Sequence, residues 1–437
     1  MTLPAYAHRR PTGIAWLGSL PDHWEVKRLR HIGKAVIGLT YDPVDVVDPE
    51  SGVLVLRSSN VQSGHIDLRD TVFVRGAIPE RLRTKIGDIL ICSRNGSRAL
   101  IGKNALIDAT SSGVTFGAFM TIFRSVYNEF LQYVFRSPLF EFQSGAFLTS
   151  TINQLTVDNL KNFEVPLPPI HEQRAIAAFL AGETARLDRL IEKRRRMIAL
   201  LHEKRASLIT HAVTRGLDPD APLKDSGLKW LGRIPATWKA GQLRRFWSVT
   251  DCKHHTVPFT DEGQPVASIG ELARHGFSLA NAKMTTQEDF DFLRRGRIPK
   301  KGDLVYCRNA SVGLVGYVDT DAPFALGQDV CLIAAAKSDC RYLYYVMVSK
   351  LIADQLAAQM VGATFKRINV EAIKEFFVPC PSPEEQCQIA LHLDTVTQGV
   401  DRTLAVTELA IARLAEYRAS LITAAVTGQI DVRGLVP

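Results

Sequence analysis

An internal duplication spans most of this 437-residue chain and constrains its fold more than any other feature. Residues 166–218, which begin PLPPIHEQRAIAAFL, align without a gap to residues 379–431, which begin PCPSPEEQCQIALHL, with about two dozen identities in some fifty positions. Shorter matches precede both copies, and WLGSLPDHW (16–24) resembles WLGRIPATW (230–238). We therefore expect two copies of one structural unit.

Each copy divides into a globular part and a helical part. The globular part mixes short β-rich runs such as GDILICS and GDLVYC with a few helical stretches and scattered glycines, which is typical of an α/β domain. The predicted fold class is α/β (α+β): two pseudo-symmetric globular domains, joined and spaced by two long helices. The predicted boundaries are 1–165 for the first globular domain, 166–216 for its strap and helix, 217–378 for the second globular domain, and 379–437 for the second helix and tail.

The apolar residues of both helical parts recur at heptad spacing, which predicts that the two helices pack on each other as an intramolecular coiled coil. The alternative is that each helix only covers the core of its own domain. One polar residue interrupts the seam at the same heptad of each copy, Arg194 and Thr407. Ser382 followed by Pro383 is a typical helix start, with the serine as N-cap. The predicted seam consists of Leu187, Ile191, Ile198, Leu201, Leu208, Val400, Leu404, Ile411, Leu414 and Leu421.

Charge and cysteine content limit the class of protein without deciding it. The net charge of +8 and pI of about 9.1 are compatible with a nucleic-acid partner and with many other proteins. No apolar run reaches the ~18 residues of a transmembrane helix. The N-terminus lacks the apolar core of a signal peptide, and seven cysteines without a CxxC pair favour reduced thiols. We therefore expect a cytoplasmic protein with no membrane segment.

Catalytic motifs are missing from the sequence. It contains no nucleophile elbow, no phosphate-binding loop and no dinucleotide fingerprint. The stretch DCKHHT (251–256) carries metal-capable side chains, but no second ligand cluster follows at a recognisable spacing. We predict no catalytic residue and no metal site in this chain.

Recognition of a polyanion is the remaining chemistry. Long polar side chains on strand ends and loops can read base edges in the major groove. RSSN and SRNGSR in the first copy match SIGELARH and CRNAS in the second, with Arg94 taken as the equivalent of Arg308. The alternatives are a tight hairpin turn for Asn95-Gly96 and an ordinary solvated loop around Arg367. The candidate DNA contacts are Arg57, Ser58, Ser59, Asn60, Arg94, Asn95, Ser97, Arg98, Lys253, His254, Glu271, Arg308, Asn309, Ser311, Lys366 and Arg367.

The order of segments resembles the DNA-specificity subunit of type I restriction–modification systems. The resemblance covers nearly the whole chain and rests on the straps with Glu-Gln, the helix ends RASLITHAVT and RASLITAAVT, and the paired WLGxxPxxW openings. It implies two target recognition domains, each reading one half of a bipartite, asymmetric site in double-stranded DNA, on helices that pair antiparallel and set the spacer. It also implies a chain without catalysis or cofactor. Its partners would be two methyltransferase (modification) subunits and restriction/translocase subunits, which would carry S-adenosylmethionine, ATP and Mg²⁺.

The repeated Glu-Gln pair has two interpretations. Glu172, Gln173, Glu385 and Gln386 either contact partner subunits or satisfy the first amides of the helices. Two competing functions also stay open. One is a coiled-coil scaffold with two protein-binding heads and no DNA role, and the other is a nuclease or methyltransferase that acts alone.

Overall fold

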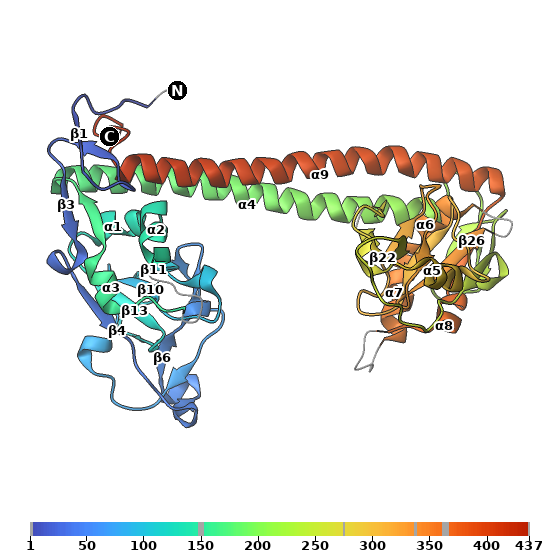
Figure 1. Cartoon of the computed structure of the whole chain (residues 1–437), viewed down its shortest axis with the longest axis horizontal. Coiled ribbons are helices and arrows are strands. Elements are labelled where there is room, and N and C mark those ends of the chain that lie inside the picture. Colours follow the sequence, from blue (N-terminus) through green and yellow to red (C-terminus); the bar gives the residue numbers. More distant parts are fainter. Residues whose placement is uncertain (1–2, 147–152, 274–275, 336–338, 361–366, 436–437) are drawn as a thin grey trace. The chain divides into compact units, whose positions relative to one another are not determined.

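The computed structural model describes residues 3–146, 153–273, 276–335, 339–360 and 367–435. The chain forms two compact units: unit 1 contains residues 1–195 and 409–437, and unit 2 contains residues 196–408. Two long helices, α4 (Ile170–Arg215) and α9 (Pro383–Val426), each belong in part to both units (Figure 1). The prediction of two α/β globular parts joined by two long helices is confirmed.

The globular part of unit 1 is built on two four-stranded sheets. The first has the strand order β11-β10-β13-β4 and is antiparallel, and the second has the order β12-β6-β9-β5, in which β12 runs parallel to β6. Strand β14, which contains the start of the strap, pairs antiparallel with β3 and leads directly into α4. The elements are β1 (Arg9–Pro11), β2 (Ser19–Pro21), β3 (Glu25–Arg28), β4 (Lys34–Ile37), β5 (Val46–Val47), β6 (Val53–Leu56), β7 (Val61–Gln62), β8 (His65–Ile66), β9 (Phe73–Val74), β10 (Ile89–Cys92), β11 (Asn104–Leu106), β12 (Thr115–Phe116), β13 (Met120–Arg124), α1 (Asn128–Phe135), α2 (Pro138–Ala146), α3 (Val157–Asn162) and β14 (Glu164–Leu167).

Unit 2 repeats this topology. The sheet β18-β26-β23-β24 corresponds to β4-β13-β10-β11, the sheet β22-β19-β25 to β9-β6-β12, and the pair β17-β27 to β3-β14. Unit 2 adds helix α5 where unit 1 has a single 3₁₀ turn, Glu80–Leu82. Its elements are β15 (Leu223–Asp225), β16 (Arg233–Pro235), β17 (Lys239–Gln242), β18 (Trp247–Thr250), β19 (Gln264–Ala267), β20 (Leu272–Ala273), β21 (Gly276–Phe277), β22 (Lys283–Thr285), α5 (Gln287–Arg294), β23 (Leu304–Cys307), β24 (Val315–Tyr317), β25 (Ala325–Leu326), β26 (Val330–Ala335), α6 (Cys340–Met347), α7 (Lys350–Gln359), α8 (Val370–Lys374) and β27 (Phe377–Cys380).

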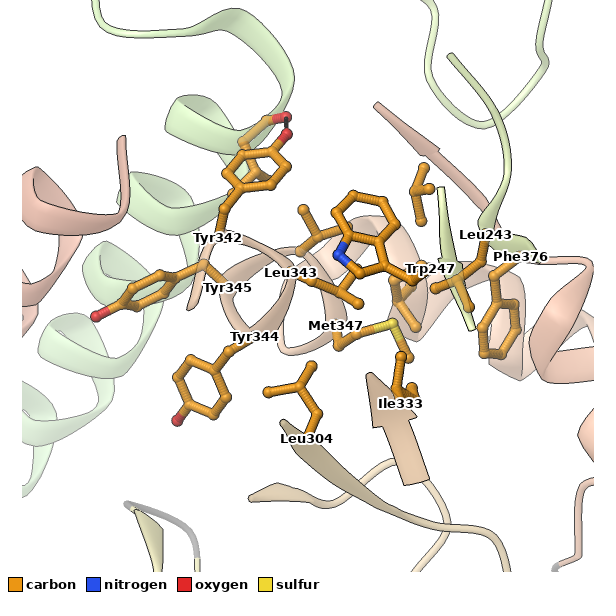
Figure 2. Packing of buried hydrophobic residues seen from close by; sticks show 14 of the residues in the cluster. Leu243, Trp247, Leu304, Ile333, Tyr342, Leu343, Tyr344, Tyr345, Met347 and Phe376 are labelled. Carbon is orange, nitrogen blue, oxygen red and sulfur yellow. Dashed lines mark hydrogen bonds between the residues drawn. The ribbon is translucent and has the colours of Figure 1, made fainter. Parts of the chain in front are cut away.

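The core of each unit includes the beginning of one long helix and the end of the other. In unit 2, Figure 2 shows Met347 of α6 packed beside Trp247 of β18 and Ile333 of β26, and Tyr342 of α6 belongs to the same cluster. The same cluster contains residues from the end of α4 and from the beginning of α9, namely Ile209, Ala212, Val213, Ile389, Ala390 and Leu393. The unit 1 cluster contains their repeat counterparts Ile176, Ala177, Leu180, Ile422, Ala425 and Val426. Since full burial of such a side chain contributes ~1.5–3 kcal/mol, both helices are firmly anchored at both of their ends.

In unit 1, Leu187 of the predicted seam lies in one apolar cluster with Leu414 and Leu421 of α9. Every predicted seam residue is buried or half-buried. Arg418 of α9 forms an ion pair with Asp188 of α4 at 3.0 Å in unit 1, and the repeat-equivalent Arg205 and Asp401 form the same ion pair at 3.0 Å in unit 2. These equivalent pairs fix the antiparallel register. The alternative, in which each helix only covers its own domain, is wrong because the helices pack on each other as well as on the domain cores.

Capping residues define the ends of both helices. The Glu385 N–H donates to Ser382 Oγ at 3.3 Å, so the predicted N-cap of α9 is confirmed. Gly216 and Gly428 follow the helices with φ of 78° and 59°, a region that glycine adopts without strain. A Cβ at Gly428 would collide with the ring of Pro21, so this helix end lies tightly against the WLGxxPxxW segment of unit 1.

Candidate nucleic-acid interface

In unit 1, the loop after β10 leaves the buried sheet at Ser93. The Ser93 hydroxyl donates to Thr121 Oγ1 at 2.5 Å inside the protein, whereas the next residue, Arg94, is exposed. The backbone N–H groups of Ser93 and Arg94 donate to the Phe119 carbonyl at 2.9 and 3.1 Å, and Arg94 forms a β-bridge with Gln154. The Arg94 guanidinium lies over the Phe119 ring, 5.2 Å from its centroid. This strand end therefore presents a cation at the surface.

Asn95 connects this loop to the RSSN segment. Its Nδ2 donates to Ser58 Oγ at 3.3 Å, and its Oδ1 accepts from the Ser97 N–H at 2.9 Å. Arg98 donates to the Gly145 carbonyl at 3.4 Å. Strand β11, the partner that follows β10, begins only beyond this loop, so the tight hairpin turn considered for Asn95 and the glycine after it is wrong. The structure thus brings Ser58, Asn95 and Ser97 together.

The RSSN segment is held in place mainly by Asn60. This side chain is fully buried, donates to the carbonyls of Asp67 and Asp70, and accepts from the Arg57 N–H at 2.8 Å. Arg57 also forms an ion pair with Asp70 at 2.9 Å, and Ser59 is exposed. Asn60 therefore shapes the loop from the inside, and the side chain is not at the surface as a base contact would require.

In unit 2, Arg308 is also an internal residue. Its side chain is only 3% exposed, with Nη1 2.8 Å from Asp251 Oδ1 and Nη2 3.4 Å from His254 Nδ1. The Arg308 N–H donates to the Asp329 carbonyl, and its carbonyl accepts from the Ile368 N–H, both at 2.9 Å. The prediction that Arg308 presents its guanidinium at the surface is wrong. Its charge is instead used to hold the Asp251 loop against the sheet.

The backbone pairs the two loops differently from the sequence match. Strands β10 and β23 occupy equivalent places in their sheets, and the second residue after each strand is Arg94 in unit 1 and Asn309 in unit 2. Arg94 bridges to Gln154, and Asn309 bridges to Arg367 in the same way. The structural counterpart of Arg94 is therefore Asn309, and the sequence-based equivalence with Arg308 is wrong by one residue.

The metal-capable residues of DCKHHT lie together but are poorly suited to a cation. Ligand atoms of Asp251, Cys252 and His254 lie within 4.8 Å of one another. The Arg308 guanidinium already neutralises the carboxylate, and Cys252 Sγ donates to the Gln328 carbonyl at 2.9 Å. Burial raises the pKa of the Cys252 thiol to about 11, which keeps it protonated. The cluster is best described as an ion pair that shapes the loop.

Lys253 and Glu271, two further candidates, also have contacts within unit 2. Lys253 Nζ lies 4.4 Å from the centroid of the Phe292 ring. Glu271 is 8% exposed, and its Oε2 accepts from the Ser268 N–H at 2.7 Å. Glu271 therefore caps a 3₁₀ turn from the inside. The candidate Lys366 lies outside the described residues.

An open cavity of about 440 Å³ lies at the end of β23, and its lining residues are His254, Asn309, Gln328, Asp329 and Arg367. Asn309 Nδ2 donates to Asp329 Oδ1 at 2.9 Å, while Gln328, Arg367 and the nearby Ser311 are exposed. Sequence reasoning missed Gln328 and Asp329. The signal available for them was two polar residues directly before a buried strand.

The Glu172 carboxylate is bound by side chains of unit 1 and does not cap the first amides of α4. It is 1% exposed, and its carboxylate accepts from Tyr6 Oη at 2.8 Å and Trp24 Nε1 at 3.0 Å, with His23 Nε2 at 2.6 Å. Arg433 Nη1 lies 3.8 Å away. Burial opposes ionisation of Glu172, but these hydrogen bonds outweigh burial, and the pKa of the carboxyl lies below its ordinary value. Glu172 therefore ties the start of α4 to the first residues of the chain.

The glutamines act alike in both straps. Gln173 Nε2 donates to the Pro168 carbonyl at 2.7 Å, and Gln386 Nε2 donates to the Pro381 carbonyl at 2.9 Å. Gln386 Oε1 also accepts from the Asp339 N–H at 2.8 Å. Both side chains thus close the turn between strap and helix. Contact with a partner subunit stays a prediction for all four residues of the Glu-Gln pairs.

Comparison with known proteins places this geometry in a family. The family described as "Type I restriction modification DNA specificity domain" matches residues 21–198 and 256–407, well over half of the chain. The chain belongs to this family. It is 24% identical over 432 residues to the specificity subunit assigned to the type I restriction enzyme MjaX of Methanocaldococcus jannaschii, covering 95% of this chain and 96% of that one. It is 23% identical over 434 residues to the EcoKI specificity subunit of Escherichia coli K12, covering 95% and 91%.

A solved structure supports the fold. A chain described under "Structural basis underlying complex assembly and conformational transition of the type I R-M system" superposes with a TM-score of 0.70 at 18% identity, covering 94% of this chain and 99% of that one. The resemblance to type I specificity subunits is thus confirmed, and with it a role in DNA-sequence recognition within a restriction–modification complex. Among the described residues, no helix has both the length and the apolar character needed to cross a bilayer.

Proposed function

We propose that this chain selects a bipartite, asymmetric site in double-stranded DNA for a type I restriction–modification complex. Each globular part reads one half-site, and the helices α4 and α9 set the spacer between the halves. The observation that carries the proposal is that the two units share one backbone frame but present different side chains at the ends of β10 and β23, Arg94 against Asn309. Two domains with the same backbone frame but different side chains at the contact positions suit a target with two different half-sites.

The spacer role rests on the two helices. The ion pairs Asp188–Arg418 and Asp401–Arg205 give both units the same helix pairing. A helix of 46 residues spans about 69 Å, and its length cannot change without unfolding. A continuous paired helix therefore suits a fixed spacer better than a flexible linker does.

The chemistry belongs, in this proposal, to partner subunits. The helices and straps dock two methyltransferase subunits, which bind S-adenosylmethionine and modify adenine. Restriction/translocase subunits bring ATP and Mg²⁺ to the complex. This chain contributes target choice and performs no reaction itself.

The test is co-expression of this chain with its cognate methyltransferase subunit in a host without adenine methylation, followed by mapping of methylated adenines by single-molecule sequencing. We expect a split motif with two different half-sites and a fixed spacer. A folded complex that gives no methylation beyond the methyltransferase alone would contradict the proposal and favour a scaffold without a DNA role.

A further inference from the structure

Three chain segments meet at equivalent places in the two units. In unit 1 they contribute Arg94 after β10, Phe119 before β13, and Gln154 ahead of the strap; we name these residues the unit 1 triad. The carbonyl of Phe119 accepts the N–H groups of residues 93 and 94, and Arg94 bridges to Gln154. The three residues are thus fixed to one another through their backbones.

The corresponding segments of unit 2 contribute Asn309, Asp329 and Arg367, which we name the unit 2 triad. The Asp329 carbonyl accepts the Arg308 N–H at 2.9 Å, and Asn309 bridges to Arg367. Each loop is also held by the thiol of the last residue of its strand. Cys92 donates to the Arg94 carbonyl at 3.8 Å in unit 1, and Cys307 donates to the Asn309 carbonyl at 3.1 Å in unit 2. The backbone frame is therefore the same in both units.

The side chains on this frame differ in charge, size and polarity. Unit 1 presents a cation over an aromatic ring that is 58% exposed. Unit 2 presents a carboxylate held by an amide, Asn309 Nδ2 to Asp329 Oδ1 at 2.9 Å, at the wall of the 440 Å³ cavity. Residues that only stabilised the shared frame would have no reason to differ in this way while the frame is retained. Binding residues lie disproportionately on loops that a rigid scaffold positions, so loop residues that differ on a shared frame are candidates for setting specificity.

The chemistry of the unit 2 triad favours base edges over phosphates. A carboxylate beside a DNA backbone meets like charge, so Asp329 is unsuited to a phosphate contact. Carboxylates are suited to the exocyclic amino group of cytosine in the major groove, and arginine to O6 and N7 of guanine. Asn309 orients the carboxylate, and Arg367, which lines the same cavity, supplies the donor.

We propose that the two triads are the positions that set the sequence of the two half-sites: Asn309, Asp329 and Arg367 for one, and Arg94, Phe119 and Gln154 for the other. This inference rests on the proposed function and adds the residues that discriminate between bases. It assigns base reading to Asp329, Phe119 and Gln154, and it assigns a supporting role to Arg308.

The test compares methylation motifs of the whole complex carrying single substitutions. Asp329→Asn keeps the shape of the side chain and replaces two acceptors with one acceptor and one donor. We expect the preference at one or two base pairs of a single half-site to fall by about 10-fold or more, with the other half-site and the spacer unchanged. Arg94→Ala should alter the other half-site only. Asp321→Asn, an exposed residue of the same unit, is the matched control and should leave the motif intact.

The outcomes separate the inference from the proposed function. If the wild-type complex yields no split motif, the proposed function fails. If it yields one and Asp329→Asn leaves both half-sites unchanged, the triad inference is overturned. An equal loss of methylation at all DNA sequences would also overturn it, since that result indicates a structural role or a phosphate contact. Circular dichroism and retained binding of the methyltransferase subunit verify that the variant is folded.

Discussion

Glu172 offers a sharp test of how the start of α4 is held, because the repeat supplies its own control. The change is Glu172→Gln, which keeps the shape of the side chain and removes the charge that accepts from Tyr6 and Trp24. Hydrogen bonds to a charged group contribute ~1.5–3 kcal/mol each, and glutamine retains one acceptor oxygen for these buried donors. We therefore expect the free energy of unfolding of unit 1 to fall by about 2–4 kcal/mol.

The matched control is Glu385→Gln in the second strap. Glu385 is the repeat counterpart of Glu172, but it is half-buried, and within the described part of the chain no side chain donates a hydrogen bond to its carboxylate. Its substitution should cost less than about 1 kcal/mol. Urea unfolding followed by hydrogen exchange of peptides from each unit measures the two losses separately. Equal losses from the two variants, or no loss from Glu172→Gln, would refute the reasoning.

The same carboxyl makes a pH prediction. Because the pKa of Glu172 is lowered in the folded protein, its contribution to stability is complete above the unfolded carboxyl pKa of about 4.3 and is lost as the pH falls through the lower folded value. Unit 1 of the wild-type chain should therefore lose more stability on acidification through this range than unit 1 of Glu172→Gln. A parallel decline of both proteins would contradict the assigned role.

Three other outcomes follow from the fold. A double-mutant cycle of Asp188→Ala and Arg418→Ala should give a coupling of only about 0.3–1 kcal/mol that falls with added salt, since the pair is part-exposed; urea unfolding measures it. Arg308→Met should lower the free energy of unfolding of unit 2 by about 1–3 kcal/mol, because Asp251 loses its ion-pair partner. Methylation mapping should show both half-sites unchanged, and an altered half-site would mean that Arg308 contacts a base. Insertion of seven residues into each helix, after residues 198 and 408, adds ~10.5 Å of helix. The spacer in the DNA site should therefore lengthen by about 3 base pairs, and neither half-site should change.

The repeat and the helices could be predicted because their signals are local or periodic. Ser382 and Pro383 specify a helix start within a few residues, and the heptad positions repeat over the whole helix. The seam residues Leu187 and Leu421 are buried for the same reason. Such features depend on spacing along the chain, which a single sequence contains in full.

The candidate nucleic-acid interface could be predicted only in part because it depends on long-range pairing. Residues 93–101 form a longer loop than residues 308–312, and a one-residue gap in the sequence match hid this difference and misplaced Arg308. The buried state of Arg308 depends on Asp251, which lies 57 residues earlier in the chain. Asp329 reaches the cavity only because β26 pairs with β23, and no local motif encodes that approach.

The bond between the chain's first and last described segments has a topological consequence. In unit 1 the Asp431 N–H donates to the Pro4 carbonyl at 2.7 Å. At the matching place in unit 2, the chain runs on unbroken from the end of α4 through residues 217–222 into β15. Unit 1 therefore makes with one hydrogen bond the connection that unit 2 makes through the covalent chain. A circular permutant with its present ends connected by a linker and opened within 217–222 would exchange the order of the two globular parts in the gene and keep the strand pairings of each unit.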